Sequence, residues 1–145
     1  MLSTSYTVRR MTAAGHGGIM ALLRNTVGVG LRDADSPEGI ARYLERNPGM
    51  SFVAEVQGTL AGCVFGGHDG RRGYLYHLAV APDCRIGSSL VAAAIAAIAA
   101  HGIEKFRIGL LAGNEDGQRF WQAIGRQAQD DLRWMPCIPS GRGNC

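Results

Sequence analysis

The sequence predicts a single α/β domain with a mixed sheet, in which an antiparallel meander is followed by a β-α-β-α unit. Short apolar runs with strand-like spacing alternate with stretches of helical spacing along the 145 residues. Three strand-like runs follow one another in the middle of the chain, separated only by short Gly-containing turns. The third run precedes a helix and a further strand, which is the order of a β-α-β unit in a sheet flanked by helices.

The first part of the chain is predicted to form one strand and two helices. Residues 6–11 have strand character, and Thr12 is a candidate cap for the helix that follows. The Gly- and Asp-rich residues 28–35 indicate a loop. Ser36 begins the second helix because serine caps helix N-termini, and Pro37 fits its first turn. An Asn-Pro-Gly sequence then ends this helix.

The middle of the chain is predicted to form the meander. Residues 51–56 and 60–66 are apolar runs joined by a Gln-Gly pair, which is typical of a tight turn. The polar residues 68–73 form the next turn, and residues 74–80 form the central strand. This order predicts consecutive antiparallel strands that end in the central one.

The β-α-β-α unit begins with the central strand. Residues 88–100 predict a helix that stops at Gly102, and residues 105–111 predict the strand parallel to the central one. Residues 114–124 predict the last helix, in which Asn114 is the N-terminal cap.

Beyond the last helix the pattern weakens. Residues 127–135 can form one final strand or a hairpin. Residues 136–145 have no periodic apolar pattern and are predicted to be a flexible tail. The folded domain is therefore expected to span residues 1–135.

Composition and charge exclude several classes of protein. The 46% hydrophobic content suffices for one core, and a net charge of +3 without Lys/Arg runs argues against nucleic-acid binding. The apolar residues 90–100 are too few to span a bilayer, which needs about 20, and no signal peptide is evident. The cysteines and histidines lack metal-ligand spacing, and Cys63 fits a small core residue. We expect a cytoplasmic protein without a metal, a membrane anchor or a nucleic-acid partner.

The stretch from Tyr74 to Ala100 predicts a buried strand, a short loop and a helix that starts near two serines. The first turn of a helix has unpaired N–H donors and the positive end of the helix dipole. A phosphorylated ligand can therefore bind where this strand passes into the helix.

Two ordered motifs make this prediction more specific. The first comprises the end of the central strand and its loop, with Leu78, Ala79, Val80, Pro82 and Arg85. The second opens the last helix, with Asn114, Gly117, Phe120, Trp121 and Gly125. In both motifs the sequence resembles the acetyl-CoA site of the GNAT superfamily of N-acetyltransferases.

The resemblance implies a GNAT-like fold in which two neighbouring parallel strands splay apart, here residues 74–80 and 105–111, and the pantetheine arm lies between them. It implies transfer of an acetyl group from acetyl-CoA to a primary amine of a small molecule, peptide or protein, and it is compatible with a homodimer. The cofactor-binding residues that it implies are Leu78, Ala79, Val80, Arg85, Ile86, Gly87, Ser88, Ser89, Asn114 and Trp121.

The chain departs from the family pattern in the loop before the helix. After Arg85 it lacks several residues of that pattern, glycines among them, which would let the backbone approach a pyrophosphate. This departure supports an alternative function, in which a degenerate GNAT domain binds acyl-CoA without catalysis or acts as a regulatory module.

The resemblance also suggests how catalysis would occur. In GNAT proteins a backbone N–H on the splayed strand polarises the thioester carbonyl, and the matching position is at or next to Val80. The general base is often a Glu on the central strand, but this strand has none, so His77 is the best candidate because histidine titrates near neutrality. A structural His77 within the sheet remains the alternative. Alternation would place Tyr74 and Tyr76 on the face opposite His77.

Other candidates are weaker. The general acid in many family members is a Tyr of the last helix, but Trp121 takes that place, and it either lines the pantetheine channel or belongs to the core. Glu55 and the pair His68 and Asp69 are lesser candidates for the base, and the pair fits simple turn chemistry. The acceptor site is expected to be built from the first two helices and the loop between them, together with the turn before Tyr74. Candidate lining residues are Arg24, Arg32, Asp33, Asp35, Tyr43, Asp69 and Arg72.

Overall fold

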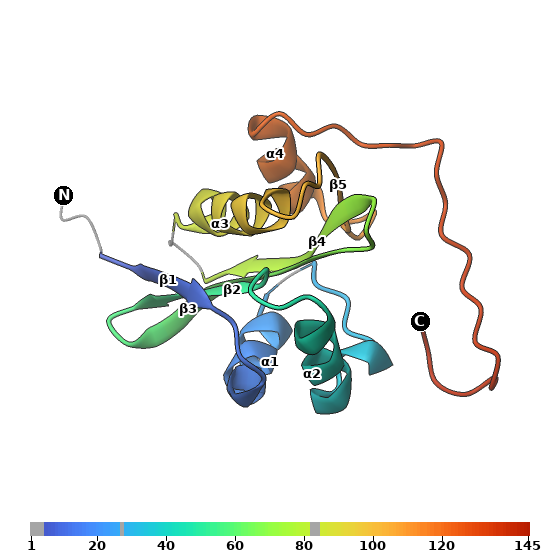
Figure 1. The fold of residues 1–145 in the computed structure, drawn as a ribbon, viewed down its shortest axis with the longest axis horizontal. Coiled ribbons are helices and arrows are strands. Elements are labelled where there is room, and N and C mark those ends of the chain that lie inside the picture. The colour runs from blue at the N-terminus through green and yellow to red at the C-terminus, as the bar shows by residue number, and fades with distance from the viewer. Residues whose placement is uncertain (1–4, 27, 82–84) are drawn as a thin grey trace.

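The computed structural model describes residues 5–26, 28–81 and 85–145 (Figure 1). Its described residues form a five-stranded sheet in the order β1-β2-β3-β4-β5, and helices cover both faces. The strands are β1 (Thr7–Arg10), β2 (Phe52–Val56), β3 (Thr59–His68), β4 (Arg72–Val80) and β5 (Lys105–Ile108). The helices are α1 (His16–Arg24), α2 (Pro37–Arg46), α3 (Gly87–Ala99) and α4 (Glu115–Ala123), with short 3-10 helices η1 (Ala13–Gly15) and η2 (Asp33–Asp35).

The strand pairing confirms the predicted mixed sheet. Strands β1 to β4 pair antiparallel with their neighbours, and β4 pairs parallel with β5 after the α3 crossover. The turn between β2 and β3 has positive φ at both central residues, 51° at Gln57 and 77° at Gly58. This backbone is that of the tight hairpin turn predicted from the Gln-Gly pair.

Each face of the sheet has its own apolar cluster. Leu90 and Ile98 of α3 are fully buried with Leu75 of β4 on one face. Leu23 of α1 and Ile40 of α2 pack with Phe65 of β3 on the other face. In Figure 1, α1 and α2 lie below the sheet, whereas α3 and α4 lie above it. Because both faces are covered, most of β3 is buried, whereas β4 is only partly buried and Tyr76 is exposed.

Side-chain caps mark the start of α2 and of α4, but not of α1 or α3. The Ser36 hydroxyl accepts a hydrogen bond from the Gly39 N–H at 3.1 Å, so the predicted cap of α2 is confirmed. The prediction for Thr12 is wrong, because this residue precedes η1 and makes no side-chain capping bond. Helix α3 begins at Gly87, one residue before the predicted start. None of the helices in the described segments is both long and apolar enough to cross a bilayer.

The predicted final strand is absent. Residues 126–145 contain no helix or strand, and they run away from α4 as an extended segment (Figure 1). Their apolar side chains reach no core, since Trp134 is 77% exposed and Met135 is 88% exposed. Residues 127–135 therefore do not form the predicted strand or hairpin: among the described residues they pair with no edge of the sheet.

The end of this segment is nevertheless tied to the domain. The Arg32 Nε donates to the Cys145 carbonyl at 2.9 Å, and the Asp33 N–H donates to Asn144 Oδ1 at 2.8 Å. The Asn144 N–H donates in return to the Asp33 carboxylate at 2.9 Å. The irregular backbone agrees with a tail, whereas its flexibility and the boundary at residue 135 stay predictions.

The packing of α3 predicts unequal costs for two matched substitutions. Ile98→Ala should reduce the free energy of unfolding by about 2–5 kcal/mol, because the Ile98 side chain is fully buried and its truncation leaves a cavity in the core. Ile95 lies one turn earlier and is only partly buried, so Ile95→Ala should cost at most about 2 kcal/mol. Urea unfolding of both variants measures the difference. Equal losses would contradict the assigned face of α3.

Candidate active site

The site is built where β4 and β5 part. The parallel ladder ends at the pair Leu75 and Ile108, and the Gly109 N–H donates to the Leu75 carbonyl at 2.9 Å just beyond it. β4 continues for residues 76–80 without a partner on the β5 side in the described part of the chain. The backbone of β4 is therefore open toward α4 over this stretch. The splay predicted for these two strands is confirmed.

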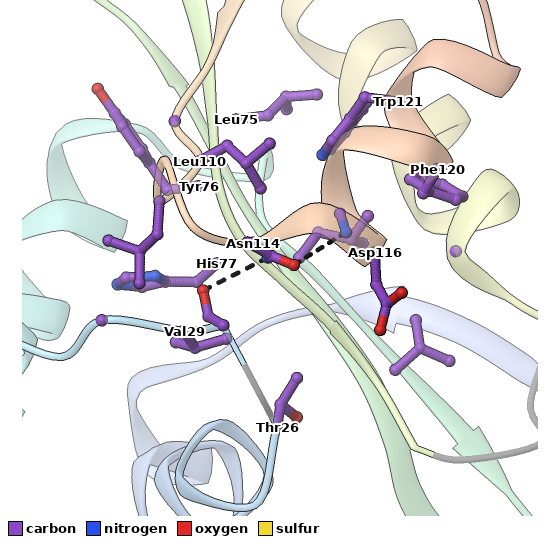
Figure 2. Close-up of a pocket in the computed structure, with 18 of the residues that line it drawn as sticks. Thr26, Val29, Leu75, Tyr76, His77, Leu110, Asn114, Asp116, Phe120 and Trp121 are labelled. Carbon is purple, nitrogen blue, oxygen red and sulfur yellow. Dashed lines mark hydrogen bonds between the residues drawn. The ribbon is translucent and has the colours of Figure 1, made fainter.

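A cavity of about 570 Å³ fills this opening. Its walls come from β4, from the β5–α4 connection with α4, from the segment between α1 and α2, and from the start of α3 (Figure 2). The lining residues are Thr26, Gly28, Val29, Gly30, Leu75, Tyr76, His77, Leu78, Val80, Arg85, Gly87, Ser88, Gly109, Leu110, Leu111, Asn114, Asp116, Gly117, Phe120 and Trp121. Such a mostly apolar cleft with a few polar groups is typical of a small-molecule site.

A β-bulge shapes the β4 wall of the cavity. On β3 only Val64 separates the two residues paired with Ala79 and Tyr76, whereas on β4 both His77 and Leu78 lie between them. His77 has a φ of +50°, which is uncommon for a residue other than glycine. The Cys63 thiol donates to the His77 carbonyl at 3.5 Å. The extra residue turns the local side chains away from regular strand alternation.

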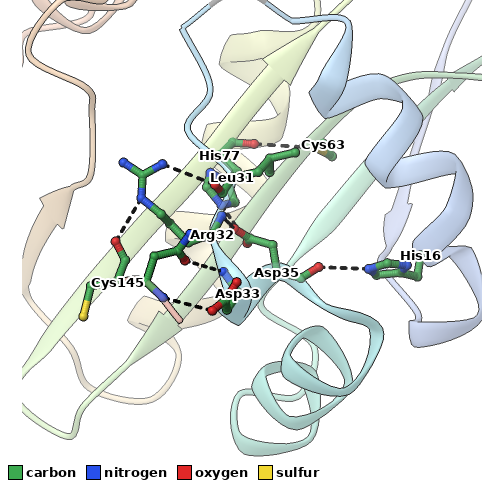
Figure 3. A network of polar contacts seen from close by, with 9 residues as sticks. His16, Leu31, Arg32, Asp33, Asp35, Cys63, His77 and Cys145 are labelled. Carbon is green, nitrogen blue, oxygen red and sulfur yellow. Dashed lines mark hydrogen bonds and ion pairs between the residues drawn. The ribbon is translucent and has the colours of Figure 1, made fainter. Parts of the chain in front are cut away.

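The bulge brings His77 to Asp35. The His77 Nε2 lies 2.9 Å from Asp35 Oδ1, and both side chains are mostly buried, with exposed fractions of 21% and 12% (Figure 3). The His77 ring also packs edge-on against Phe65, with ring centroids 5.6 Å apart. Tyr76 lies directly opposite that same Phe65 in the β3–β4 ladder. The prediction that Tyr76 lies on the face opposite His77 is therefore wrong, because the bulge interrupts alternation.

Asp35 is held from several sides. Its second carboxylate oxygen accepts the Arg32 N–H at 2.8 Å, and its backbone carbonyl lies 3.0 Å from His16 Nε2 (Figure 3). Partial burial raises the pKa of Asp35, but the hydrogen bonds from His77 and Arg32 and their positive charges outweigh it and leave that pKa below its ordinary value. Asp35 is thus a carboxylate at neutral pH.

The opposite wall is fixed by Asn114 and Trp121. The Asn114 Oδ1 accepts the Gly117 N–H at 2.9 Å and caps α4 as predicted, while its Nδ2 donates to the Gly28 carbonyl at 3.4 Å (Figure 2). Trp121 is 6% exposed, belongs to the core cluster and also lines the cavity. The core interpretation of Trp121 is therefore confirmed, and its place in a pantetheine channel stays a prediction.

Comparison with known proteins agrees with this geometry. A sequence model of the family described as the acetyltransferase (GNAT) family matches residues 19–125, which is most of the chain.

The chain belongs to the acetyltransferase (GNAT) family.

Curated relatives of the GNAT chain support the assignment. An N-acetyltransferase of Yersinia pestis is 34% identical over 106 residues, covering 70% of this chain and 75% of the relative. An acetyltransferase of Pectobacterium atrosepticum is 33% identical over 116 residues, covering 77% and 78%. The PaiA N-acetyltransferase of Thermoplasma acidophilum, solved with coenzyme A, has the same fold with a TM-score of 0.74 at 18% identity, covering 87% and 92% of the two chains. The chain is an acetyltransferase, as the sequence predicted.

The GNAT structure brings most of the predicted site residues to one cavity. His77, Leu78 and Val80 line it from β4, Arg85, Gly87 and Ser88 line it at the start of α3, and Asn114 and Trp121 line it from the α4 side.

Three predicted residues lie outside the lining. Ala79 is 1% exposed and packs toward α1 and α2, and Ile86 is 3% exposed in the other core cluster. The Ser89 hydroxyl shares a hydrogen bond with the Tyr6 hydroxyl. Pro82 and Cys84 of the predicted loop lie outside the described residues.

Gly87 has a visible packing reason. A Cβ at this position would lie 3.2 Å from the Phe120 ring, so glycine lets the first turn of α3 approach α4 closely. Gly87 and Ser88, in the first turn of α3, both line the cavity, and the first N–H groups of a helix have no partner within the helix.

The weaker candidates for the base have structural roles. The Glu55 carboxylate on β2 accepts a hydrogen bond from Arg9 Nε on the edge strand β1 at 2.8 Å, and Glu55 is not among the residues that line the cavity. The Asp69 carboxylate accepts the N–H groups of Arg71 and Arg72, each at 2.8 Å, which is the predicted turn chemistry. In the described chain, no cluster of three His, Cys, Asp or Glu residues could hold a metal ion.

The residues predicted to line the acceptor site have different partners in the structure. Asp35 reaches His77, whereas Arg32 and Asp33 bind the C-terminal segment. The Tyr43 hydroxyl is buried without a hydrogen-bond partner among the described residues, and burial raises the pKa of that hydroxyl. Thr26, Gly28, Val29 and Gly30 also line the cavity. The sequence analysis expected an acceptor site at the loop between the first two helices but named none of these residues, because none of them has a charged or titratable side chain.

The bulge predicts an inverted preference between glycine and alanine at position 77. Both His77→Gly and His77→Ala remove the imidazole, so their difference isolates the backbone. Because φ is +50°, His77→Gly should be more stable than His77→Ala by about 1 kcal/mol, the reverse of the usual order in a strand. Urea unfolding measures it. A glycine variant less stable than the alanine variant would rule out the bulge.

The lowered pKa of Asp35 predicts a pH-dependent contribution to stability. Its folded pKa lies below the ordinary value of 3.8, so its contribution is present above that value and is lost as the pH falls through the folded pKa. Asp35→Asn should therefore be less stable than wild type at pH 7, and the two should converge in acid. Urea unfolding across this pH range measures both. A difference that stays constant into acid would contradict the ion pair.

Proposed function

We propose that this chain transfers the acetyl group of acetyl-CoA to a primary amine of a small molecule or peptide. The observation that carries the proposal is the open backbone edge of β4 beyond Leu75, which leads along the cavity to the first turn of α3. An open strand edge can hydrogen-bond an extended arm with amide groups, and a helix start can hold a phosphate.

The cofactor would lie along the open edge of β4 and reach the first turn of α3. At the start of α3, the N–H groups of Gly87 and Ser88 have no hydrogen-bond acceptor among the described residues, and intrahelical pairing is seen from the Leu90 N–H, which donates to Ile86. Arg85 adds a positive charge on the same rim. The pantetheine arm would pass between β4 and α4, with Trp121 as the apolar wall. The acetyl group would then lie beside the bulge.

Each step of the transfer has a group nearby. A backbone N–H on the free edge of β4, at or next to Val80, would bind the carbonyl oxygen as it gains negative charge. The amine nitrogen attacks the carbonyl carbon, the C–S bond breaks, and CoA leaves as the thiolate. The amine proton passes to His77, the one imidazole that lines the cavity in the described residues. Trp121 supplies no proton, so the thiolate takes one from solvent.

A second function is a non-catalytic module that binds acyl-CoA. Two features favour this function. Trp121 stands where many family members have an acidic Tyr, and the loop after Arg85 is shorter than in the family pattern. The two functions share the cavity and differ in turnover. Binding of acetyl-CoA without acetyl transfer to any amine in a broad acceptor screen would support the module.

The position of Val80 in the cavity lining predicts that a larger side chain there weakens cofactor binding. Wild type should bind acetyl-CoA with a dissociation constant of about 1 μM in a calorimetric titration. Val80→Phe fills the space beside the open edge and should weaken binding by about tenfold or more. Val56→Phe adds the same volume on β2, away from the cavity, and should bind as wild type does.

Transfer is then measured by mass spectrometry of an acceptor panel of diamines, amino sugars and peptide N-termini. An acetylated product that requires both acetyl-CoA and the cavity supports the proposed enzyme. Absence of acetyl-CoA binding by folded wild type would overturn both functions. Recovery of binding after insertion of a family-length glycine loop behind Cys84 would identify a degenerate cofactor site.

A further inference from the structure

We propose that Asp35 is a positioning residue for His77: it holds the proton on Nε2, so that Nδ1 carries the lone pair that accepts the amine proton. This inference rests on the proposed function, because it assigns a partner to the base of that reaction. It adds η2, an element far from the cofactor motifs in sequence, to the catalytic apparatus.

The contact is well defined. His77 Nε2 and Asp35 Oδ1 are 2.9 Å apart, and the Asp35 side chain is 12% exposed. The other Asp35 oxygen is occupied by the Arg32 N–H at 2.8 Å, so the carboxylate cannot rotate freely. The lowered pKa of Asp35 agrees with a carboxylate that acts as an acceptor only.

The contact decides the tautomer of His77. A neutral imidazole has one N–H donor and one nitrogen acceptor, and the carboxylate can only accept. Nε2 must therefore carry the hydrogen, and Nδ1 keeps the lone pair. No hydrogen bond to Nδ1 is made by any residue in the described segments, while His77 lines the cavity. When Nδ1 gains the amine proton, the same carboxylate stabilises the imidazolium.

The strained backbone fits this role. A φ of +50° at His77 costs free energy, and such conformations persist where the surroundings hold them. The Phe65 ring, 5.6 Å from the imidazole, and the thiol of Cys63 on the His77 carbonyl hold the residue from β3. Asp35 holds it from η2. The bulge thus places one imidazole between the cavity and a fixed carboxylate.

The first test reads the tautomer directly. Nitrogen-15 NMR of histidine-labelled wild type, at a pH where the ring is neutral, should show His77 with the hydrogen on Nε2. Asp35→Ala should lose this preference, whereas Glu38→Gln, which removes an exposed charge at the next helix start, should keep it. A wild-type His77 with the hydrogen on Nδ1 would overturn the inference, whether or not the protein transfers acetyl groups.

The second test separates positioning from folding. In Asp35→Asn, kcat should fall by about tenfold to a hundredfold, while KM for acetyl-CoA and for the amine stays near wild type. Glu38→Gln should keep the wild-type kcat. If wild type transfers acetyl groups and Asp35→Asn retains full kcat, the inference fails and the proposed function stands. If wild type has no transferase activity, the proposed function fails, and the NMR result still decides the state of His77.

Discussion

The loss of pairing between β4 and β5 beyond Leu75 and Ile108 is the constraint on which the site depends. A buried strand edge without partners would be costly, because backbone N–H and C=O groups lose water without gaining hydrogen bonds. Here the edge faces a cavity instead of a packed core. α4 covers the far side of that cavity, and Asn114 ties the start of α4 to the segment between α1 and α2. The open edge is therefore kept open by its neighbours.

Much of the fold could be predicted because its signals are local. Ser36, Asn114 and the Gln-Gly turn each satisfy nearby backbone groups, so sequence spacing alone identifies them. The prediction of a final strand at residues 127–135 was wrong because a strand depends on a distant partner and not on local signals. Trp134 and Met135 have strand-like character, but a strand also needs a partner edge, and sequence spacing does not reveal where one is available.

The candidate site was predicted unevenly for a similar reason. The residues on β4, α3 and α4 follow one another in motifs, so the resemblance found them together. The bulge at His77 carries no glycine to mark it, and the contact between His77 and Asp35 joins residues 42 positions apart. The Asp35 carboxylate was one of several charges in a predicted loop. Only the tertiary arrangement distinguishes it from Asp33, which binds the C-terminal segment.

The two tryptophans of the chain occupy opposite environments. Trp121 is 6% exposed in the cavity wall, and its ring meets Phe120 edge-on with centroids 5.2 Å apart, whereas Trp134 is 77% exposed on the extended segment. Their fluorescence is consequently separable, because a buried indole emits at shorter wavelength than a hydrated one, and a soluble quencher reaches only the hydrated one. The protein therefore contains an intrinsic optical reporter of what enters the space between β4 and α4.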